Sequence, residues 1–216
     1  MKSKLLIALL FLCSASLPTL GQSDKQSQEI LNGVSAKYKS YKSVKATFSI
    51  AVENSKDKSK NSQKGTIYIK GNKYKLQIAG QDVISDGKSR WTYLKDANEI
   101  QIDHLRNDEN SITPTNVFTL YEKGWHSKYI GETKKGNVTL QQIELIPIDP
   151  KKKNVFKVKL NINKGTKVLE SAQVYDKNGS IQTITVDSFA SDVIDDENFF
   201  TFNSGSYPGA EVIDLR

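Results

Sequence analysis

The stretch KGTIYIKGNKYKLQI, from Lys64 to Ile78, determines the fold class more than any other part of the sequence. β-Branched and aromatic residues alternate with polar ones on both sides of Gly71-Asn72, and this is the period of a half-buried strand. Two residues between two such runs allow only a tight hairpin, because a parallel pair needs a much longer crossover. The stretch therefore predicts two antiparallel strands, Thr66 to Lys70 and Lys73 to Ile78.

The same alternation recurs from Val44 onward. Turn signals such as Asp86-Gly87, Lys164-Gly165 and Asn178-Gly179 separate neighbouring runs, so we expect an antiparallel meander. The further strands are expected at Arg90 to Tyr93, Asn98 to Ile102, Val138 to Ile146, Val155 to Ile162, Leu169 to Tyr175 and Ile181 to Phe189, with weaker runs at Phe48 to Val52, Asp82 to Ser85 and Lys128 to Gly131. Together the runs predict about eleven strands.

Three other segments depart from the strand pattern. An amphipathic helix is expected between Ser23 and Ser43, where one apolar stripe is formed by Ile30, Leu31, Val34, Tyr38 and Tyr41. Thr113-Pro114-Thr115 is typical of the start of a short helix, which would continue through Val117, Phe118, Leu120 and Tyr121. The lysine- and serine-rich tract Ser55 to Lys64 is expected to be a mobile hairpin loop.

The composition is that of one ordinary globular domain. The chain has 216 residues, and its 31 Lys or Arg against 24 Asp or Glu give a net charge of +7. A hydrophobic content of 37% is enough to build a core. The single cysteine, Cys13, excludes a disulfide framework, and two histidines exclude a multi-histidine metal centre. We therefore expect neither a metal site nor a cofactor.

The N-terminus has the order of a secretory signal peptide. Lys2 and Lys4 precede the apolar run Leu5 to Leu12, and small residues follow up to Gly21. We expect a leader at residues 1–21, removed on export, and a single domain at 22–216 without a membrane-spanning segment. Lipid attachment at Cys13 is the less favoured alternative, because Leu12 precedes the cysteine where a lipobox needs a small residue. Without Cys13 the mature chain has no cysteine, which suits an oxidising export compartment.

One face of the expected sheet is apolar. In Val155 to Ile162, Phe156, Val158 and Leu160 share a face while lysines occupy the other. A curved sheet of such strands can wrap around a ligand cavity, or it can simply pack a filled core under the helix. Alternation alone favours the filled core.

Several segments in order resemble the LolA family of periplasmic lipoprotein carriers. They are VKATFSI (Val44 to Ile50), KGTIYIKGNKYKLQI, ISDGKSRWTYLKDANEIQI (Ile84 to Ile102) and FFTFNSGSYPGAEVIDL (Phe199 to Leu215). The most specific element is the Ser85-Asp86-Gly87 turn followed by Trp91 and Tyr93. The resemblance covers nearly all of the expected mature chain. It implies a mainly β (α+β) fold, an unclosed antiparallel β-barrel of about eleven strands under an N-terminal helix and a short helical lid.

The resemblance also implies a function and partners. Such a protein would hold the acyl chains of lipoproteins and move them through the periplasm from the inner toward the outer membrane. Its partners would be acylated lipoproteins, an inner-membrane ABC-type exporter like LolCDE and an outer-membrane acceptor like LolB. We expect a monomer that binds no nucleic acid.

Candidate site residues follow from the expected inner faces. The wall of an acyl-chain cavity is predicted to comprise Leu76, Ile78, Trp91, Tyr93, Phe156, Val158, Leu160, Ile184 and Val186, and the lid Ile30, Leu31, Val34, Tyr38, Phe118 and Leu120. One feature of the family is missing. Where known members have WVKRP, with an arginine that governs lid closure, this chain reads Tyr68-Ile69-Lys70-Gly71-Asn72. Lys70 lacks the bidentate guanidinium fork, so the contacts of the lid are expected to be mostly apolar.

Two other classes of function compete with a carrier. Catalysis could be sought at Glu53, at Asp103-His104, at Asp195-Asp196-Glu197 or at His126-Ser127, but no nucleophile elbow or Gly-rich phosphate cradle accompanies them. The second class is an exported binding module or adaptor with a filled core that acts through its surface. The lysines at 56, 58, 60, 64 and 151–153 are either solvated loop residues or a means of orienting the protein toward acidic partners or anionic lipids.

Overall fold

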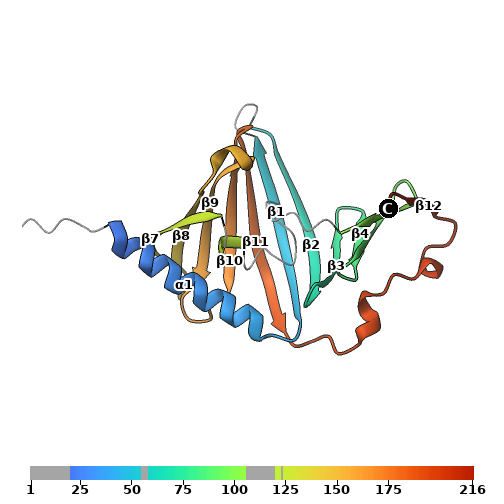
Figure 1. Cartoon of the computed structure of the whole chain (residues 1–216), viewed down its shortest axis with the longest axis horizontal. Helices are drawn as coiled ribbons and strands as arrows, with labels where there is room; N and C mark the ends of the chain where they lie inside the picture. Colours follow the sequence, from blue (N-terminus) through green and yellow to red (C-terminus); the bar gives the residue numbers. More distant parts are fainter. Residues whose placement is uncertain (1–19, 55–57, 106–119, 123) are drawn as a thin grey trace, which may run out of the picture.

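The computed structural model describes residues 20–54, 58–105, 120–122 and 124–216. It contains one long helix and a single curved sheet of twelve strands (Figure 1). The elements are α1 (Leu20–Ser40), β1 (Val44–Asn54), β2 (Lys60–Lys70), β3 (Lys73–Ile78), β4 (Gln81–Ser85), β5 (Ser89–Leu94), β6 (Glu99–His104), η1 (Leu120–Glu122), β7 (Trp125–Lys135), β8 (Val138–Pro147), η2 (Pro150–Lys152), β9 (Val155–Asn163), β10 (Leu169–Asp176), β11 (Ser180–Ser191), η3 (Glu197–Phe200), η4 (Ser204–Ser206) and β12 (Glu211–Asp214), where η marks a 3-10 turn.

The strands form two meanders that meet at β1 and β11. The order across the sheet is β12-β6-β5-β4-β3-β2-β1-β11-β10-β9-β8-β7, so the first strand lies beside the eleventh. The antiparallel β1–β11 ladder runs from Val44 opposite Ser191 to Asn54 opposite Ser180. The expectation of one continuous meander is therefore wrong at this seam, and β12 adds a parallel pairing with β6. The expected mainly β class and the unclosed sheet are confirmed.

Some boundaries differ from the sequence expectations. β2 begins at Lys60, so half of the predicted loop Ser55 to Lys64 is strand, because β1 continues far enough to pair Glu53 with Lys60. Pairing with a neighbouring strand has overridden the low strand propensity of this tract. The helix ends at Ser40, before Tyr41, and begins at Leu20, ahead of the expected start at Ser23. Of the predicted short helix only Leu120–Glu122 is described, as a 3-10 turn.

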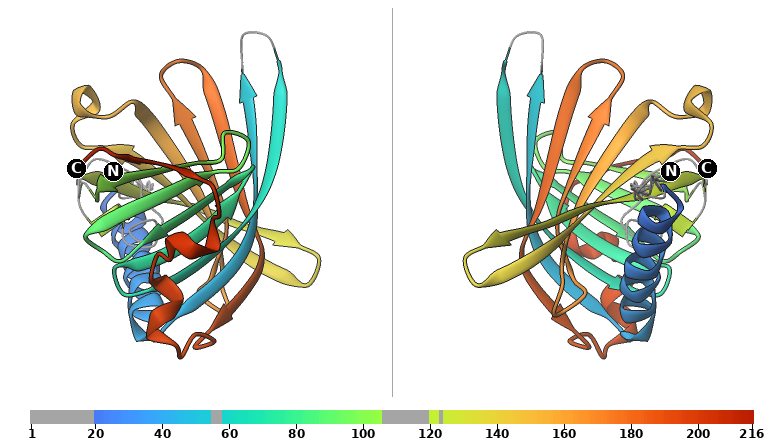
Figure 2. Two further views of the ribbon diagram at one scale, coloured as in Figure 1. Left: turned by 90° about the vertical axis from the view of Figure 1, so that its right-hand side faces the viewer. Right: turned by 90° about the vertical axis from the view of Figure 1, so that its left-hand side faces the viewer.

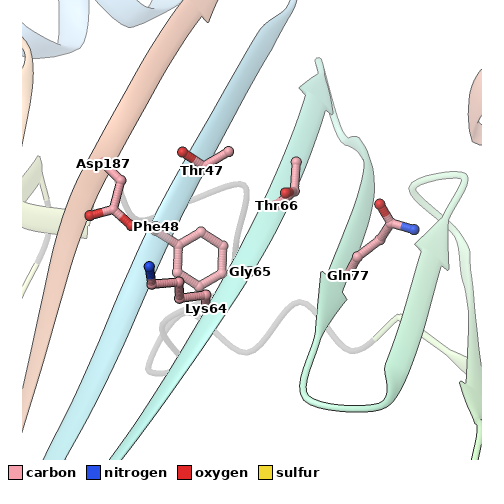
Figure 3. A pocket seen from close by; sticks show the side chains of 7 residues that line it. All are labelled: Thr47, Phe48, Lys64, Gly65, Thr66, Gln77 and Asp187. Atoms are coloured by element: carbon pink, nitrogen blue, oxygen red, sulfur yellow. The ribbon is translucent and has the colours of Figure 1, made fainter.

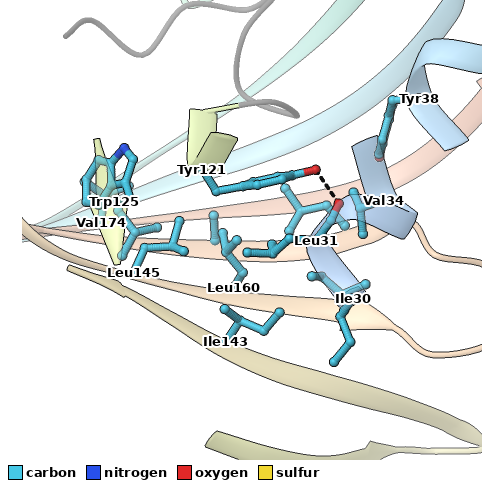
Figure 4. Close-up of a cluster of buried hydrophobic side chains, with 14 of the residues drawn as sticks. Ile30, Leu31, Val34, Tyr38, Tyr121, Trp125, Ile143, Leu145, Leu160 and Val174 are labelled. Carbon is cyan, nitrogen blue, oxygen red and sulfur yellow. Dashed lines mark hydrogen bonds between the residues drawn. The ribbon is translucent and has the colours of Figure 1, made fainter. Parts of the chain in front are cut away.

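α1 covers one face of the sheet, which we call the helix-facing side. The helix crosses the strands from β7 toward the end of β11 (Figure 1). Its buried residues Ile30, Leu31 and Val34 pack in one cluster with side chains such as Ile143 and Leu160 (Figure 4). The 3.6-residue period of the helix and the two-residue period of the strands thus bring their apolar sides together. This cluster is the principal core.

A second apolar layer lies on the opposite side of β3 to β6. The segment that contains η3, η4 and β12 runs across the outside of these strands (Figure 2, left). Phe200 is buried there, and Phe202 stacks on Trp91 with ring centroids 5.5 Å apart. Tyr207 in turn contacts Tyr93 with a centroid distance of 4.5 Å. The outer face of β5 and β6 is therefore apolar and is covered by this segment.

The predicted leader, residues 1–21, lies almost wholly outside the described residues. Among the residues that the structure describes, no helix has both the length and the apolar character required to cross a bilayer.

Candidate functional site

An apolar surface continues from the core onto strands that α1 does not cover. Ile184 pairs with both Ile50 and the buried Ala172, so these residues lie on the helix-facing side. Ile67 lies on the same side, because it is two residues before the core residue Ile69 on β2, and it pairs with Leu76. These side chains are only half-buried. We call this surface the apolar strip; it consists of Ile50, Ile67, Leu76, Ile78, Ile184 and Val186.

The helix-facing side of β1, which carries Ile50 of the strip, becomes more exposed toward Asn54. Val44, at the end near the helix, is 6% exposed, whereas Val52 on the same strand is 37% exposed. The aromatic residues Tyr38, Tyr41 and Phe189 close the buried end, with Tyr38 and Phe189 ring centroids 5.6 Å apart. The apolar strip therefore opens toward the end of β1 that carries Asn54.

A charged pair borders the strip on the helix-facing side of β5 and β6. Arg90 Nη2 donates to Asp103 Oδ1 at 2.7 Å, and Arg90 Nε to Asp103 Oδ2 at 3.3 Å. The hydrogen bond to Asp103 raises the pKa of Arg90, so the guanidinium stays charged. Bidentate pairs of this kind have a fixed geometry. The concave surface thus joins an apolar region to a polar region.

Four polar contacts fix α1 to its surroundings. Tyr121 Oη donates to the Leu31 carbonyl at 2.7 Å (Figure 4), and the Ser27 and Ser127 hydroxyl oxygens lie 2.7 Å apart. Ser35 Oγ donates to Glu122 Oε1, and Lys39 Nζ lies 2.6 Å from the same oxygen. Desolvation raises the pKa of Tyr121, so its hydroxyl keeps its proton. The expectation of mostly apolar lid contacts is therefore incomplete for the described residues.

A shallow depression of about 410 Å³ lies on the other side of the sheet (Figure 3). It is lined by Thr47, Phe48, Lys64, Gly65, Thr66, Gln77 and Asp187. Thr47, Thr66 and Gln77 follow one another across the β1–β2 and β2–β3 ladders, on the face opposite Ile67 and Leu76. Five of its seven lining residues carry polar side chains, so it suits an acyl chain less well than the strip does.

Comparison with known proteins identifies the family. The sequence profile described as "Outer membrane lipoprotein carrier protein LolA" matches residues 39–203. The chain belongs to the LolA family. No curated protein matches the sequence.

Solved structures share the fold of this LolA-family chain. An uncharacterized conserved protein from Thermus thermophilus has a TM-score of 0.59 at 13% identity, covering 88% of this chain and 99% of its own. The lipoprotein LppX of Mycobacterium tuberculosis has a TM-score of 0.51 at 15% identity, with coverages of 80% and 99%. MucB in its complex with MucA from Pseudomonas aeruginosa has a TM-score of 0.50 at 12% identity, with coverages of 83% and 62%. At these identities the likeness concerns the fold alone.

The predicted wall residues of this LolA-family protein fall into three groups. Leu76, Ile78, Ile184 and Val186 belong to the apolar strip. Val158 and Leu160 are buried in the principal core with the helix residues. Trp91, Tyr93 and Phe156 lie on the opposite face.

The third group is a correction with two causes. Trp91 pairs with Ile84, whose neighbour Val83 pairs with Leu76, so the register turns Trp91 and Tyr93 away from the strip. Period-two alternation groups Trp91 and Tyr93 on the apolar face of β5, but it does not show which side of the sheet that face occupies, because the register with β4 decides this. Phe156 sits at an irregularity of the β9–β10 ladder, where Tyr175 pairs with Lys157 and Asp176 with Val155. This bulge directs Phe156 toward Tyr175, at a centroid distance of 6.0 Å.

The predicted lid residues of α1 lie together. The side chains of the other two predicted lid residues, Phe118 and Leu120, lie outside the described part of the chain. Ile30, Leu31, Val34 and Tyr38 are all buried against the sheet. Phe118 lies outside the described residues, and for Leu120 only the backbone, in η1, is described.

Sequence reasoning missed several residues of the site. Ile50 and Ile67 belong to the strip, and the alternation of their strands could have indicated them. Arg90 and Asp103 were not expected to face the strip, although Arg90 precedes Trp91 and must point to the other side.

Four of the residues considered for catalysis have structural partners. Asp103 binds Arg90, and Glu53 Oε2 lies 3.0 Å from Lys60 Nζ. Asp196 accepts the N–H of Asn198 as the cap of η3, and Ser127 contacts Ser27. Among the described residues, no group of three or more His, Cys, Asp or Glu side chains could hold a metal ion.

Proposed function

We propose that this LolA-family protein carries lipoproteins by holding their acyl chains on the apolar strip. The single observation that supports this most is the strip itself, a half-buried aliphatic surface continuous with the core but not covered by α1. Leu76, Ile78, Ile184 and Val186 form the proposed wall, and Val158 and Leu160 would join it if α1 moved. Ile30, Leu31, Val34 and Tyr38 form the proposed lid.

The energetics require a partly open site. Burial is worth about 0.8 kcal/mol per methylene, so complete burial of three acyl chains would exceed the affinity at which non-covalent binding saturates. A carrier must also release its cargo. Incomplete enclosure by the strip, or the cost of displacing α1, would lower the affinity to a reversible range.

The cellular setting is part of the same proposal. The leader at residues 1–21 would direct the domain at 22–216 to the periplasm, where the protein would act as a monomer without enzymatic activity. It would receive lipoproteins from an ABC-type exporter like LolCDE and pass them to a LolB-like acceptor in the outer membrane. The name of the family supports this direction of transport.

The test compares two arginine substitutions on neighbouring residues of β11. Ile184→Arg places a charge in the strip, whereas Thr183→Arg places it on the opposite face. A fluorescent triacylated lipopeptide should bind Ile184→Arg about tenfold or more weakly than the wild type, because an apolar site does not solvate a charge. Thr183→Arg should bind normally. Equal binding by both variants, with intact circular dichroism, would contradict the proposal.

A solvatochromic dye distinguishes the alternative of a binding module with a filled core. A carrier should take up the dye and release it when lipopeptide is added. A protein with a filled core should leave the dye in water, and this result would favour the adaptor function.

A further inference from the structure

Three parts of the chain lie side by side at one end of the sheet. They are the paired ends of β1 and β2, the segment from Ile148 to Asn154 around η2, and the β10–β11 turn (Figure 2, top). Asn54 pairs with Ser180 in the β1–β11 ladder, and the Lys177 N–H donates to the Asn154 carbonyl at 2.9 Å. The three parts therefore form one continuous surface.

This surface, which we call the lysine end, carries an excess of positive charge. Its described lysines are Lys58, Lys60, Lys151, Lys152, Lys157 and Lys177, and all except the half-buried Lys157 are exposed. The described acids around them are Glu53, Glu144, Asp149 and Asp176, and Glu144 Oε2 lies 3.8 Å from Lys157 Nζ. Glu53 is 3.0 Å from Lys60, and Asp149 is 3.7 Å from Lys152. The lysines outnumber the acids, so the described surface has a net positive charge.

Large apolar side chains are exposed among these lysines. Ile148 is 57% exposed and Phe156 is 45% exposed. Ile146 is also exposed and follows Leu145, the last residue of the β8–β9 ladder, so it lies near Lys157. Lys157 Nζ is 5.9 Å from the centroid of the Phe156 ring. Exposed apolar residues grouped in this way are typical of an interaction surface.

The apolar strip opens at the same end. Val52, a large apolar residue that is exposed, lies two residues before Asn54, where the strand ends. Whatever contacts the lysine end is therefore close to the open end of the strip.

We propose that the lysine end docks on the surface of a membrane that contains anionic phospholipids. The lysines contact the headgroup phosphates, while Ile148 and Phe156 enter the interfacial region. Cations attract anionic headgroups, and apolar side chains between them gain free energy only where a non-aqueous layer accepts them. An anionic bilayer supplies both partners in one surface, phosphates for the lysines and an apolar interfacial layer for Ile148 and Phe156. Docking brings the open end of the strip to the lipid, but it does not depend on the carrier function.

Vesicle sedimentation tests the docking with the purified protein and no acylated ligand. Vesicles of phosphatidylcholine and phosphatidylglycerol at a ratio of about 3:1 should bind the protein at low salt, whereas pure phosphatidylcholine vesicles should not. Lys151→Glu with Lys152→Glu should weaken this binding about 30-fold or more, from the free energy expected for two lysines near an anionic surface. The matched control is Lys134→Glu with Lys135→Glu, two exposed lysines at the far end of β7 and β8. It should bind nearly as well as the wild type.

A second pair of variants tests the apolar contribution. Ile148→Ser should weaken binding about tenfold, because the side chain no longer enters the interface. Val193→Ser, an equally exposed position beside the start of β1 at the other end of the sheet, should have no effect.

Three results would overturn the proposal. The first is no binding of the wild type to the anionic vesicles. The second is equal weakening by both lysine pairs, which would reflect net charge alone. The third is binding to polyglutamate but not to vesicles, which would assign the surface to an acidic protein. Lipopeptide affinity, measured separately without vesicles, should be unchanged in the Lys151 and Lys152 variant, so failure of docking and failure of the carrier function are distinguishable.

Discussion

Gly65 lies under the ring of Phe48 in the β1–β2 ladder. A Cβ atom at this position would be 2.6 Å from Phe48 Cζ and 2.9 Å from the backbone oxygen of Gln77. Gly33 in α1 differs, because the nearest atom to its Cβ would be Lys167 Cδ at 3.8 Å. The two glycines should therefore respond to alanine in opposite directions.

The first prediction compares these two substitutions. Gly65→Ala should lower the free energy of unfolding by about 1–3 kcal/mol through overpacking. Gly33→Ala should raise it by about 0.5–1 kcal/mol, because alanine loses less backbone entropy in a helix. Urea titrations would measure both changes. Unchanged stability of Gly65→Ala would mean that the Phe48 ring moves aside without cost.

Tyr38 and Tyr121 are buried phenols whose ionisation opposes folding. Desolvation raises the pKa of both groups above the usual value for tyrosine. Because the pKa is higher in the folded state, their contribution to stability is fully present below the unfolded pKa of about 10 and is lost as the pH rises above it. Ionisation of the two phenols should therefore lower the free energy of unfolding at alkaline pH.

The second prediction uses Tyr121→Phe to test whether Tyr121 causes part of the stability loss at alkaline pH. At pH 7 the variant should lose about 1 kcal/mol, because the Leu31 carbonyl loses its second donor. Between pH 10 and 12 its stability should fall less steeply than that of the wild type, which titrates one more buried phenol. Parallel pH profiles, from denaturant titrations at each pH, would exclude Tyr121 as a source of the alkaline loss.

At the scale of elements, α1 and β7 are joined by a contact that can be made covalent. The Ser27 and Ser127 hydroxyl oxygens are 2.7 Å apart, so cysteines at both positions would be close enough for a disulfide. If α1 is the lid, this bond would fix it closed. Cys13 would be replaced by serine to avoid competing bonds.

The third prediction is that oxidised Ser27→Cys/Ser127→Cys protein binds lipopeptide more weakly than reduced protein, because the fixed helix keeps Val158 and Leu160 out of the site. The matched control is Thr47→Cys/Ser188→Cys, where the wild-type hydroxyls lie 2.6 Å apart across the β1–β11 seam, away from the helix. This control should bind lipopeptide in both redox states. Normal loading of the locked α1 variant would show that acyl chains enter without movement of the helix.

At the scale of the whole molecule, one sheet supports two apolar layers. Leu145 is buried in the principal core under α1, and Phe200 is buried in the outer layer over β3 to β6. The hydrogen bonds of the sheet are continuous from β12 to β7. A cavity in either layer should therefore lower the stability of the whole sheet.

The fourth prediction is that Leu145→Ala and Phe200→Ala both shift one cooperative unfolding transition. Each should cost about 3–5 kcal/mol, the usual effect of a large cavity in a core. Tryptophan fluorescence reports both layers, because Trp125 lies in the principal core and Trp91 in the outer layer. Fluorescence and far-ultraviolet circular dichroism should give coincident midpoints in both variants. Separate midpoints for Phe200→Ala would mean that the outer layer unfolds alone.

The sequence by itself determined the fold class and most of the strands. Period-two alternation and short turns predicted β3 with its observed bounds and β9 and β10 to within one residue at either end. The stripe from Ile30 to Tyr38 predicted the buried side of α1. These features are local, since each depends on the spacing of residues within one element.

Only the tertiary structure decided which face each apolar residue occupies. Trp91 and Leu76 follow the same kind of alternation, yet they lie on opposite faces, because the register of β3 with β4 and of β4 with β5 fixes their direction. The pairing of β1 with β11 joins residues far apart in the chain, and no local period encodes it. A one-residue shift of register or a bulge exchanges the two faces of a strand. The strand pattern was therefore readable in advance, whereas the apolar strip and the lysine end exist only because distant strands pair in this order.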